Sequence, residues 1–219
     1  MAEKRGLSQE ALKLLACVTM LIDHIGAVFF PTVLGWRIVG RLAFPIYCFL
    51  MAEGMARTRN VKQYGIRLAI GAVLAEIPFD LLFFGKLTLA HQSVMVTLLI
   101  GYGMVLLMQR FPRFGMFSLF ACAILAELLG TDYGALGVLM IGLFVLTRES
   151  RYRSWVQAGL LAVMTWFLNG YWVQMLAVAG MIPISLYNGK KSTHSKAVQW
   201  IFYLFYPVHL SVLYLISRL

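Results

Sequence analysis

The chain has 219 residues, 61% of them hydrophobic, and a mean hydropathy of +0.79. This is too apolar for an ordinary soluble domain, and the long continuous apolar runs are unlike the alternating short segments of a β-barrel. A net charge of +10 would suggest nucleic-acid binding in a soluble protein. Here the Lys and Arg residues fall in short loops between apolar runs, so membrane topology accounts for them better.

Charged residues and Gly/Pro punctuation divide the chain into about nine apolar segments close to membrane-spanning length. In chain order, they are predicted at residues 8–30, 36–56, 62–84, 91–109, 114–130, 133–147, 154–168, 170–187 and 197–217. The fifth and sixth segments are short and alternatively form one re-entrant hairpin. The first lacks an A-x-A cleavage site and is expected to remain as a transmembrane helix. We therefore predict an all-α polytopic membrane protein with a single domain over residues 1–219.

The distribution of basic residues predicts a cytoplasmic N-terminus in the bacterial inner membrane. Thirteen basic residues fall on the predicted inner side: Lys4, Arg5, Arg57, Arg59, Lys62, Arg110, Arg113, Arg148, Arg151, Arg153, Lys190, Lys191 and Lys196. Only three, Arg37, Lys86 and Arg218, fall on the predicted outer side.

The three cysteines, Cys17, Cys48 and Cys122, lie within apolar runs at no metal-ligand spacing, so they are interpreted as small buried side chains.

The stretch "LIDHIG" at residues 21–26 places two ionisable residues, Asp23 and His24, inside the first apolar run. Such residues are costly in hydrocarbon and usually functional. Lys13 precedes His24 by eleven residues, which is nearly three whole helical turns. Both side chains should therefore lie on one stripe, about 16 Å apart along the axis, with Asp23 about 100° away from it.

Further polar residues gather at the predicted outer ends of the segments. They are Arg41, Glu76, Asp80, His91, Gln92, Glu127, Asp132, Asn169, Gln174 and His209. A smaller inner set consists of Lys13, Glu53, Arg57 and Arg67. Two polar sets of this kind suggest a cavity or tunnel across the bundle. Glu53 and Arg57 have i, i+4 spacing and are expected to pair, whereas Glu76 and Asp80 repeat that spacing with like charges.

Five blocks of the sequence together resemble the TraX family. They are "LKLLACVTMLIDHIG", "RLAFPIYCFLMAEGMARTRN", "YGIRLAIGAVLAEIPFDLLF", "DYGALGVLMIGL" and "FYLFYPVHLSVLYLI". The best-known member of this family is associated with conjugation and N-acetylates pilin at the inner membrane. The family looks related to the larger transmembrane acyltransferases, in which a basic residue, ten intervening residues and a histidine lie on the first helix. Lys13 and His24 fit that spacing, with Lys in place of Arg.

The resemblance implies a transmembrane acyltransferase domain that takes an acyl group, expected to be acetyl, from cytoplasmic CoA. His24 would be the general base or the acyl carrier. Asp23, Glu127 or Asp132 would orient a histidine or bind an acceptor amine. The CoA phosphates would be bound by the cationic side chains of Lys13, Arg57, Arg59 and Arg67. Arg41, Glu76, Asp80, Tyr133 and His209 complete the expected acceptor site with Glu127 and Asp132. The sequence does not identify the acceptor, which is a pilin-like peptide, a sugar or a lipid.

Other interpretations of the same residues remain. His24 alternatively bonds a neighbouring helix, Asp23 braces the second segment through Arg41, and the Glu53–Arg57 pair is structural. A metal site is not expected, because the histidines are scattered without i, i+4 spacing. The whole chain is alternatively a small proton-coupled transporter, since intramembrane acids and histidines suit proton relays, or a noncatalytic assembly factor for a surface structure. No second half mirrors the first, as many transporters require.

Overall fold

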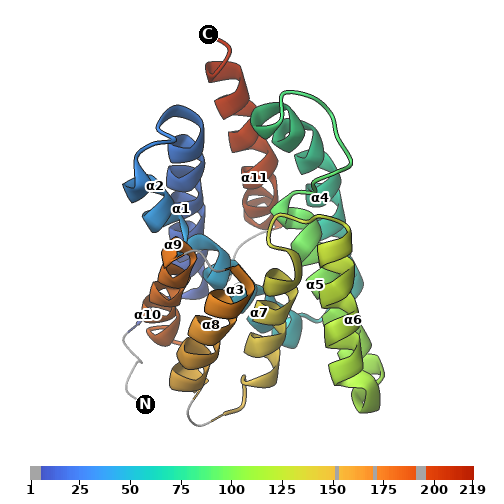
Figure 1. Cartoon of the computed structure of the whole chain (residues 1–219). Coiled ribbons are helices and arrows are strands. Elements are labelled where there is room, and N and C mark those ends of the chain that lie inside the picture. Colours follow the sequence, from blue (N-terminus) through green and yellow to red (C-terminus); the bar gives the residue numbers. More distant parts are fainter. Residues whose placement is uncertain (1–5, 151–152, 170–171, 191–195) are drawn as a thin grey trace. The chain divides into compact units, whose positions relative to one another are not determined.

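A computed structural model describes residues 6–150, 153–169, 172–190 and 196–219. Within these ranges every regular element is a helix, accompanied by two isolated β-bridges, so the prediction of an all-α chain is confirmed for the described residues (Figure 1). Four of the basic residues used to predict topology, Lys4, Arg5, Arg151 and Lys191, lie outside the described ranges.

The α-helices of the described residues are, in chain order, α1 (Gln9–Phe29), α2 (Leu34–Gly40), α3 (Ala43–Arg57), α4 (Val61–Phe83), α5 (Val94–Arg110), α6 (Gly115–Leu128), α7 (Gly134–Leu146), α8 (Arg153–Asn169), α9 (Trp172–Met175), α10 (Met181–Ser185) and α11 (Lys196–Ile216). Two 3₁₀ turns, η1 (Pro112–Phe114) and η2 (Leu176–Gly180), join α5 to α6 and α9 to α10.

Two predicted segments are interrupted in the structure. The segment at 36–56 is broken by a turn at residues 41–42 into α2 and α3. Pro45 follows within the first turn of α3, where its missing N–H is not needed. The segment at 170–187 becomes α9, η2 and α10. Gly180 and Pro183 lie in this segment, and both residue types weaken a continuous α-helix.

Among the described residues, three helical stretches are long and apolar enough to cross a membrane: Gln9–Phe29, Leu34–Arg57 (α2 together with α3) and Val198–Ile216. Helix α4 is also long, with 23 residues, but it carries charged side chains along its length: Lys62, Arg67, Glu76 and Asp80. Helices α6 and α7 have 14 and 13 residues. At 1.5 Å per residue each is about 20 Å long, which is short of the roughly 30 Å hydrocarbon core of a bilayer.

The chain divides into two compact units, each built from two separated segments. The first unit contains Met1–Leu50 and Thr147–Phe202, and in it α1 packs against α2 while α8 packs against η2 and α10. The segment before α1 pairs with the segment after α10. Leu7 N–H donates to the Leu186 carbonyl at 2.8 Å, and Asn188 N–H donates to the Leu7 carbonyl at 3.0 Å.

The second unit contains Met51–Leu146 and Tyr203–Leu219. Helix α5 packs against α4, α6 and α7, and α6 packs against α7. The fully buried side chains of Met104, Val138, Met140 and Ile141 fill the interior of this group. The prediction of one domain over residues 1–219 stays a prediction.

Candidate functional site

Helix α1 carries the residues that the sequence singles out first. Ser8 begins it as an N-cap, with its side-chain oxygen accepting from Ala11 N–H at 3.2 Å. Because the helix runs without a break from Gln9 to Phe29, Lys13 and His24 lie on one stripe, about 16 Å apart along the axis. Both side chains are half-buried. The Lys13 ammonium lies 5.2 Å from the centroid of the Phe202 ring, a cation–π distance.

Cys17 lies on the same helix, one turn after Lys13. Its buried thiol is 3.2 Å from the hydroxyl of Tyr47 on α3. Cys48 and Cys122 are also buried, so the interpretation of all three cysteines as small buried side chains is confirmed. The sequence alone held no signal for the contact with Tyr47, because the two residues are 30 positions apart.

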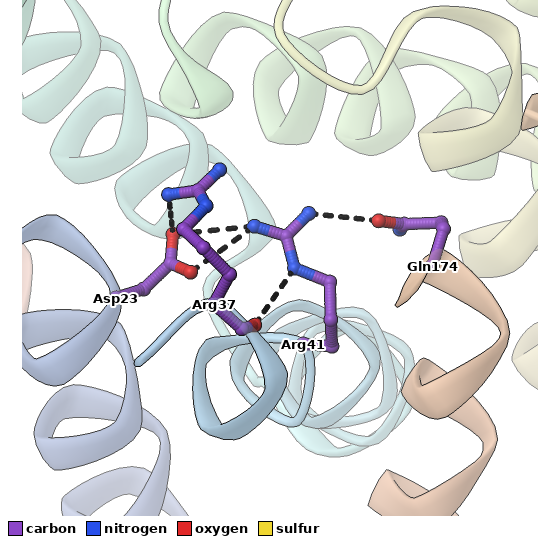
Figure 2. A network of polar contacts seen from close by, with 4 residues as sticks. All are labelled: Asp23, Arg37, Arg41 and Gln174. Atoms are coloured by element: carbon purple, nitrogen blue, oxygen red, sulfur yellow. Dashed lines mark hydrogen bonds and ion pairs between the residues drawn. The ribbon is translucent and has the colours of Figure 1, made fainter. Parts of the chain in front are cut away.

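Asp23 is the centre of an ion cluster between α1 and α2 (Figure 2). The Arg37 Nη1 atom is 2.7 Å from Asp23 Oδ2, and the Arg41 Nη2 atom is 3.1 Å from Asp23 Oδ1. Arg41 Nη1 also donates to the Gln174 side-chain oxygen at 2.7 Å, and its Nε donates to the Arg37 carbonyl at 3.3 Å. The Asp23 and Gln174 side chains are buried. The cluster thus links α1, α2 and α9.

Two glycines let α1 and α2 approach closely enough to form this cluster. A Cβ atom at Gly40 would overlap the Asp23 side chain, and one at Gly26 would overlap the Trp36 side chain. The Trp36 ring stacks on Phe30, with centroids 5.2 Å apart. Each helix therefore packs a side chain against the glycine backbone of the other helix. This close packing holds Asp23 within reach of both guanidinium groups.

The expected contact of Asp23 with Arg41 is confirmed, whereas the roles of Arg37 and Gln174 were missed. The sequence places Arg37 among the outer basic residues and Gln174 among the outer polar residues, and no contact with Asp23 or Arg41 is predicted for either. One signal was present, because Arg37 and Arg41 have i, i+4 spacing and share a helix face. Gln174 is 133 residues from Arg41, and no local pattern links them.

The predicted acidic acceptor-binding residues lie in the second unit, at one end of it. Their carboxylates accept backbone N–H groups: Glu76 from Ser93 at 3.1 Å, Asp80 from Thr88 at 2.8 Å, and Glu127 from Ala135 at 2.9 Å. Gln92 and Asp132 join the two loops of this end, since Asp132 N–H donates to the Gln92 carbonyl at 2.9 Å. Asp132 is exposed and its neighbour Tyr133 is half-buried.

The basic residues predicted to meet CoA have different surroundings within the second unit. Arg57 Nε is 2.8 Å from Glu53 Oε2, which confirms the expected i, i+4 pair, and Glu53 is buried. Arg59 is exposed in the connection from α3 to α4. The Arg67 guanidinium lies 5.5 Å from the centroid of the Tyr203 ring.

Two histidines of the second unit contact aromatic rings. His209 is buried in α11, where its Nδ1 is 2.7 Å from the Phe205 carbonyl and its ring stacks on Phe205. His91 is exposed and stacks on Phe84. Among the described residues, no group of three or more His, Cys, Asp or Glu side chains is placed to hold a metal ion.

Comparison with known proteins assigns the family. The sequence model of the TraX family, described as "TraX protein", matches residues 8–217, so the chain belongs to this family. One of the proteins similar to this chain is named for fimbrial assembly. The probable fimbrial assembly protein FimC, serogroup H1, of Dichelobacter nodosus is 27% identical over 240 residues, which cover 97% of each chain. An uncharacterized protein, RP591, of Rickettsia prowazekii (strain Madrid E) is 30% identical over 100 residues, covering 46% of this chain and 37% of that protein. No solved structure is significantly similar to this chain.

Proposed function

We propose that this chain is a multi-pass inner-membrane acyltransferase that acts in the assembly of a fimbria or pilus. The observation that carries the proposal is the match to the TraX family over residues 8–217. The similarity to the relative named for fimbrial assembly extends over 97% of that protein's length, which supports a role connected with surface fibres. The apolar helices Gln9–Phe29, Leu34–Arg57 and Val198–Ile216 support membrane insertion.

The proposed reaction transfers an acyl group from acyl-CoA to an amine or hydroxyl. The acceptor nitrogen or oxygen forms a bond to the thioester carbonyl carbon while the carbon–sulfur bond breaks. Neutral His24 takes the acceptor's proton, and the departing CoA thiolate receives a proton to leave as the thiol. In the alternative order, His24 is acylated first and passes the acyl group on. The half-buried position of His24 on α1 is compatible with either order.

Lys13 is proposed to attract the anionic end of the donor. It shares the α1 stripe with His24, and the distance of about 16 Å between them is comparable to the length of an extended pantetheine arm. Arg57, Arg59 and Arg67 remain proposed contacts for the CoA phosphates. The buried Asp23 is proposed to hold the geometry of α1 and α2 rather than to transfer protons, because both of its oxygens accept from guanidinium groups.

Purified protein in an uncharged detergent tests the enzyme proposal. Acetyl-CoA binding and CoA release are measured with a panel of peptide-amine, sugar and lipid acceptors, for wild type, His24→Ala and His91→Ala. We expect release by the wild type, a loss of about 100-fold or more in His24→Ala, and no change in the control His91→Ala, whose ring is exposed. Folded wild-type protein that does not bind acetyl-CoA, or His24→Ala protein that releases CoA normally, would refute the proposal.

Lys13 is tested by donor affinity. Lys13→Ala should weaken acetyl-CoA binding by about tenfold, because a charge-assisted contact is lost. Lys86→Ala is the matched control, since Lys86 is exposed in the connection between α4 and α5. Equal affinities of Lys13→Ala and Lys86→Ala for acetyl-CoA would show that Lys13 does not contribute to donor binding.

A noncatalytic assembly factor is the second candidate, and the description of the Dichelobacter nodosus relative favours it. In a host that assembles the fibres, this candidate predicts normal fibres with His24→Ala and lost fibres only when the chain is deleted or unfolded. The enzyme proposal predicts the loss of acyl groups from the acceptor in His24→Ala cells, with the protein still present in the membrane.

A further inference from the structure

The guanidinium of Arg37 has more hydrogen-bond donors than its contacts use. It carries five N–H groups, of which Nη1 donates to Asp23 Oδ2 at 2.7 Å. Within the described part of the chain, Nε and Nη2 of Arg37 donate to no residue. Figure 2 shows the second terminal nitrogen of Arg37 directed away from the Asp23 carboxylate. The side chain is 35% exposed, so these donors are open to a group from outside the chain.

The surface around Arg37 is apolar. Helix α2 and the turn before it expose Phe30, Val33, Leu34 and Val39, which are between 36% and 50% exposed. Apolar side chains of this size suit contact with acyl chains. Arg37 is thus a cationic group with open donors on a surface that otherwise favours hydrocarbon.

A guanidinium in such surroundings is costly without an anionic partner. Asp23 supplies one carboxylate, but that carboxylate is shared with Arg41 at 3.1 and 3.3 Å. Asp23 lies six residues before the end of α1, so the cluster is about 9 Å along the axis from the helix end. An anionic oxygen group that approaches from the membrane would complete the coordination of Arg37.

We propose that Arg37 binds the phosphate of an anionic membrane amphiphile, with the amphiphile's tail lying along the exposed apolar side chains of α2. Phosphate oxygens match the planar fork of a guanidinium and accept two parallel hydrogen bonds from it. The apolar surroundings select an amphiphile over free phosphate, because the tail removes Val33 and Leu34 from contact with water at the membrane surface.

Three probes distinguish the contribution of the amphiphile's phosphate head from that of its acyl tail. Purified wild-type protein in an uncharged detergent is titrated with dioctanoyl phosphatidic acid, with dioctanoylglycerol and with inorganic phosphate, and binding is followed by tryptophan fluorescence and by the thermal midpoint. We expect saturable binding of the phosphatidic acid, at least about tenfold tighter than that of either other probe. Equal binding of inorganic phosphate would replace the proposal with a site for free anions, and equal binding of dioctanoylglycerol would show that the head contributes nothing.

Two variants of the cluster give opposite expected results. Arg37→Gln should weaken phosphatidic acid binding by about tenfold or more, and Arg113→Gln, which changes an exposed arginine on η1, should leave it unchanged. Asp23→Asn removes the internal carboxylate that competes for Arg37, so it should tighten binding.

Arg37→Lys is the variant to use if Arg37→Gln does not fold. It keeps the charge but loses the planar fork, and we expect weaker binding that still exceeds that of dioctanoylglycerol. Unchanged affinity in both Arg37 variants, or weaker binding in Asp23→Asn, would overturn the proposal and leave Arg37 as a bracing residue only.

Discussion

The acidic residues of the two units show two kinds of contact. In the first unit, Asp23 accepts from the side chains of Arg37 and Arg41 and thereby ties two helices together. In the second unit, Glu53 also pairs with a side chain, that of Arg57, whereas Glu76, Asp80 and Glu127 accept from backbone N–H groups that follow their helices in the chain. One arrangement joins charged side chains, and the other fixes loop backbones.

The difference shows that an acidic residue in an apolar segment can hold structure in two ways. A carboxylate that satisfies a loop amide acts through local structure, and its loss should loosen one loop. A carboxylate between two guanidinium groups neutralises two positive charges. Its loss leaves both charges without an anionic partner, so it should affect the whole helix pair. Four substitutions sharpen this comparison, and they follow in order of decreasing expected effect.

Asp23→Ala is expected to be the most damaging of the four. It leaves the Arg37 and Arg41 guanidinium groups without their shared carboxylate, and we expect the free energy of unfolding in detergent to fall by about 3 kcal/mol. Asp23→Asn keeps an oxygen acceptor and the side-chain volume, so its effect should be smaller. If the two variants unfold at the same denaturant concentration, the cluster does not stabilise the helix pair.

Gly40→Ala tests the close approach of α1 and α2. The added Cβ would overlap the Asp23 side chain, and we expect a loss of about 2 kcal/mol from overpacking. Gly35→Ala on the same short helix is the matched control, because no atom lies within 4 Å of its added Cβ. Its thermal midpoint should be unchanged or slightly raised, and equal destabilisation by both changes would contradict the packing described for α2.

Glu76→Ala tests the backbone-bracing role in the second unit. It removes the acceptor of Ser93 N–H, which lies in a buried residue, so we expect a loss of about 1.5 kcal/mol. Hydrogen exchange should speed up at the Ser93 amide and remain slow at the Thr88 amide, which donates to Asp80. Acceleration at both amides would mean that the loop unfolds as one piece.

Glu149→Ala should have no measurable effect on stability. Glu149 Oε1 is 3.0 Å from Arg148 Nη1, but the Glu149 side chain is 90% exposed. Exposed pairs of this kind contribute little because water screens the charges and the side chains lose freedom on pairing. A clear drop in the thermal midpoint would show that this pair resembles the buried Asp23 cluster after all.

Much of the helical pattern follows from the sequence because long apolar runs between charged residues leave few alternatives. The first segment, predicted at 8–30, is α1 at Gln9–Phe29, with Ser8 as its cap. The breaks at residues 41–42 and in 170–187 were not predicted, since single residues such as Arg41, Gly180 and Pro183 leave the mean hydropathy of both segments high. Hydropathy records which residues tolerate hydrocarbon, and it does not record where the backbone turns.

The candidate site was only partly predictable. The contact of Asp23 with Arg41 was one of two interpretations of Asp23, and the structure contains that contact. The catalytic interpretation of Asp23 stays a prediction. The i, i+4 pair of Glu53 and Arg57 followed from helix periodicity alone. Gln174 and Tyr47 were beyond reach, because their partners lie 133 and 30 residues away and only tertiary packing brings them together. The catalytic role of His24 stays a prediction.

The pairing of Leu7 with Leu186 and Asn188 has a consequence for how the chain threads the bilayer. In the proposed multi-pass topology, two backbone segments joined by hydrogen bonds share one face of the membrane, so the number of crossings between them is even. Any revision of the segments between α1 and α10 therefore adds or removes crossings in pairs, as a re-entrant hairpin at 114–147 would. Topology reporters fused before Gly6 and inserted after Asn188 should report the same compartment.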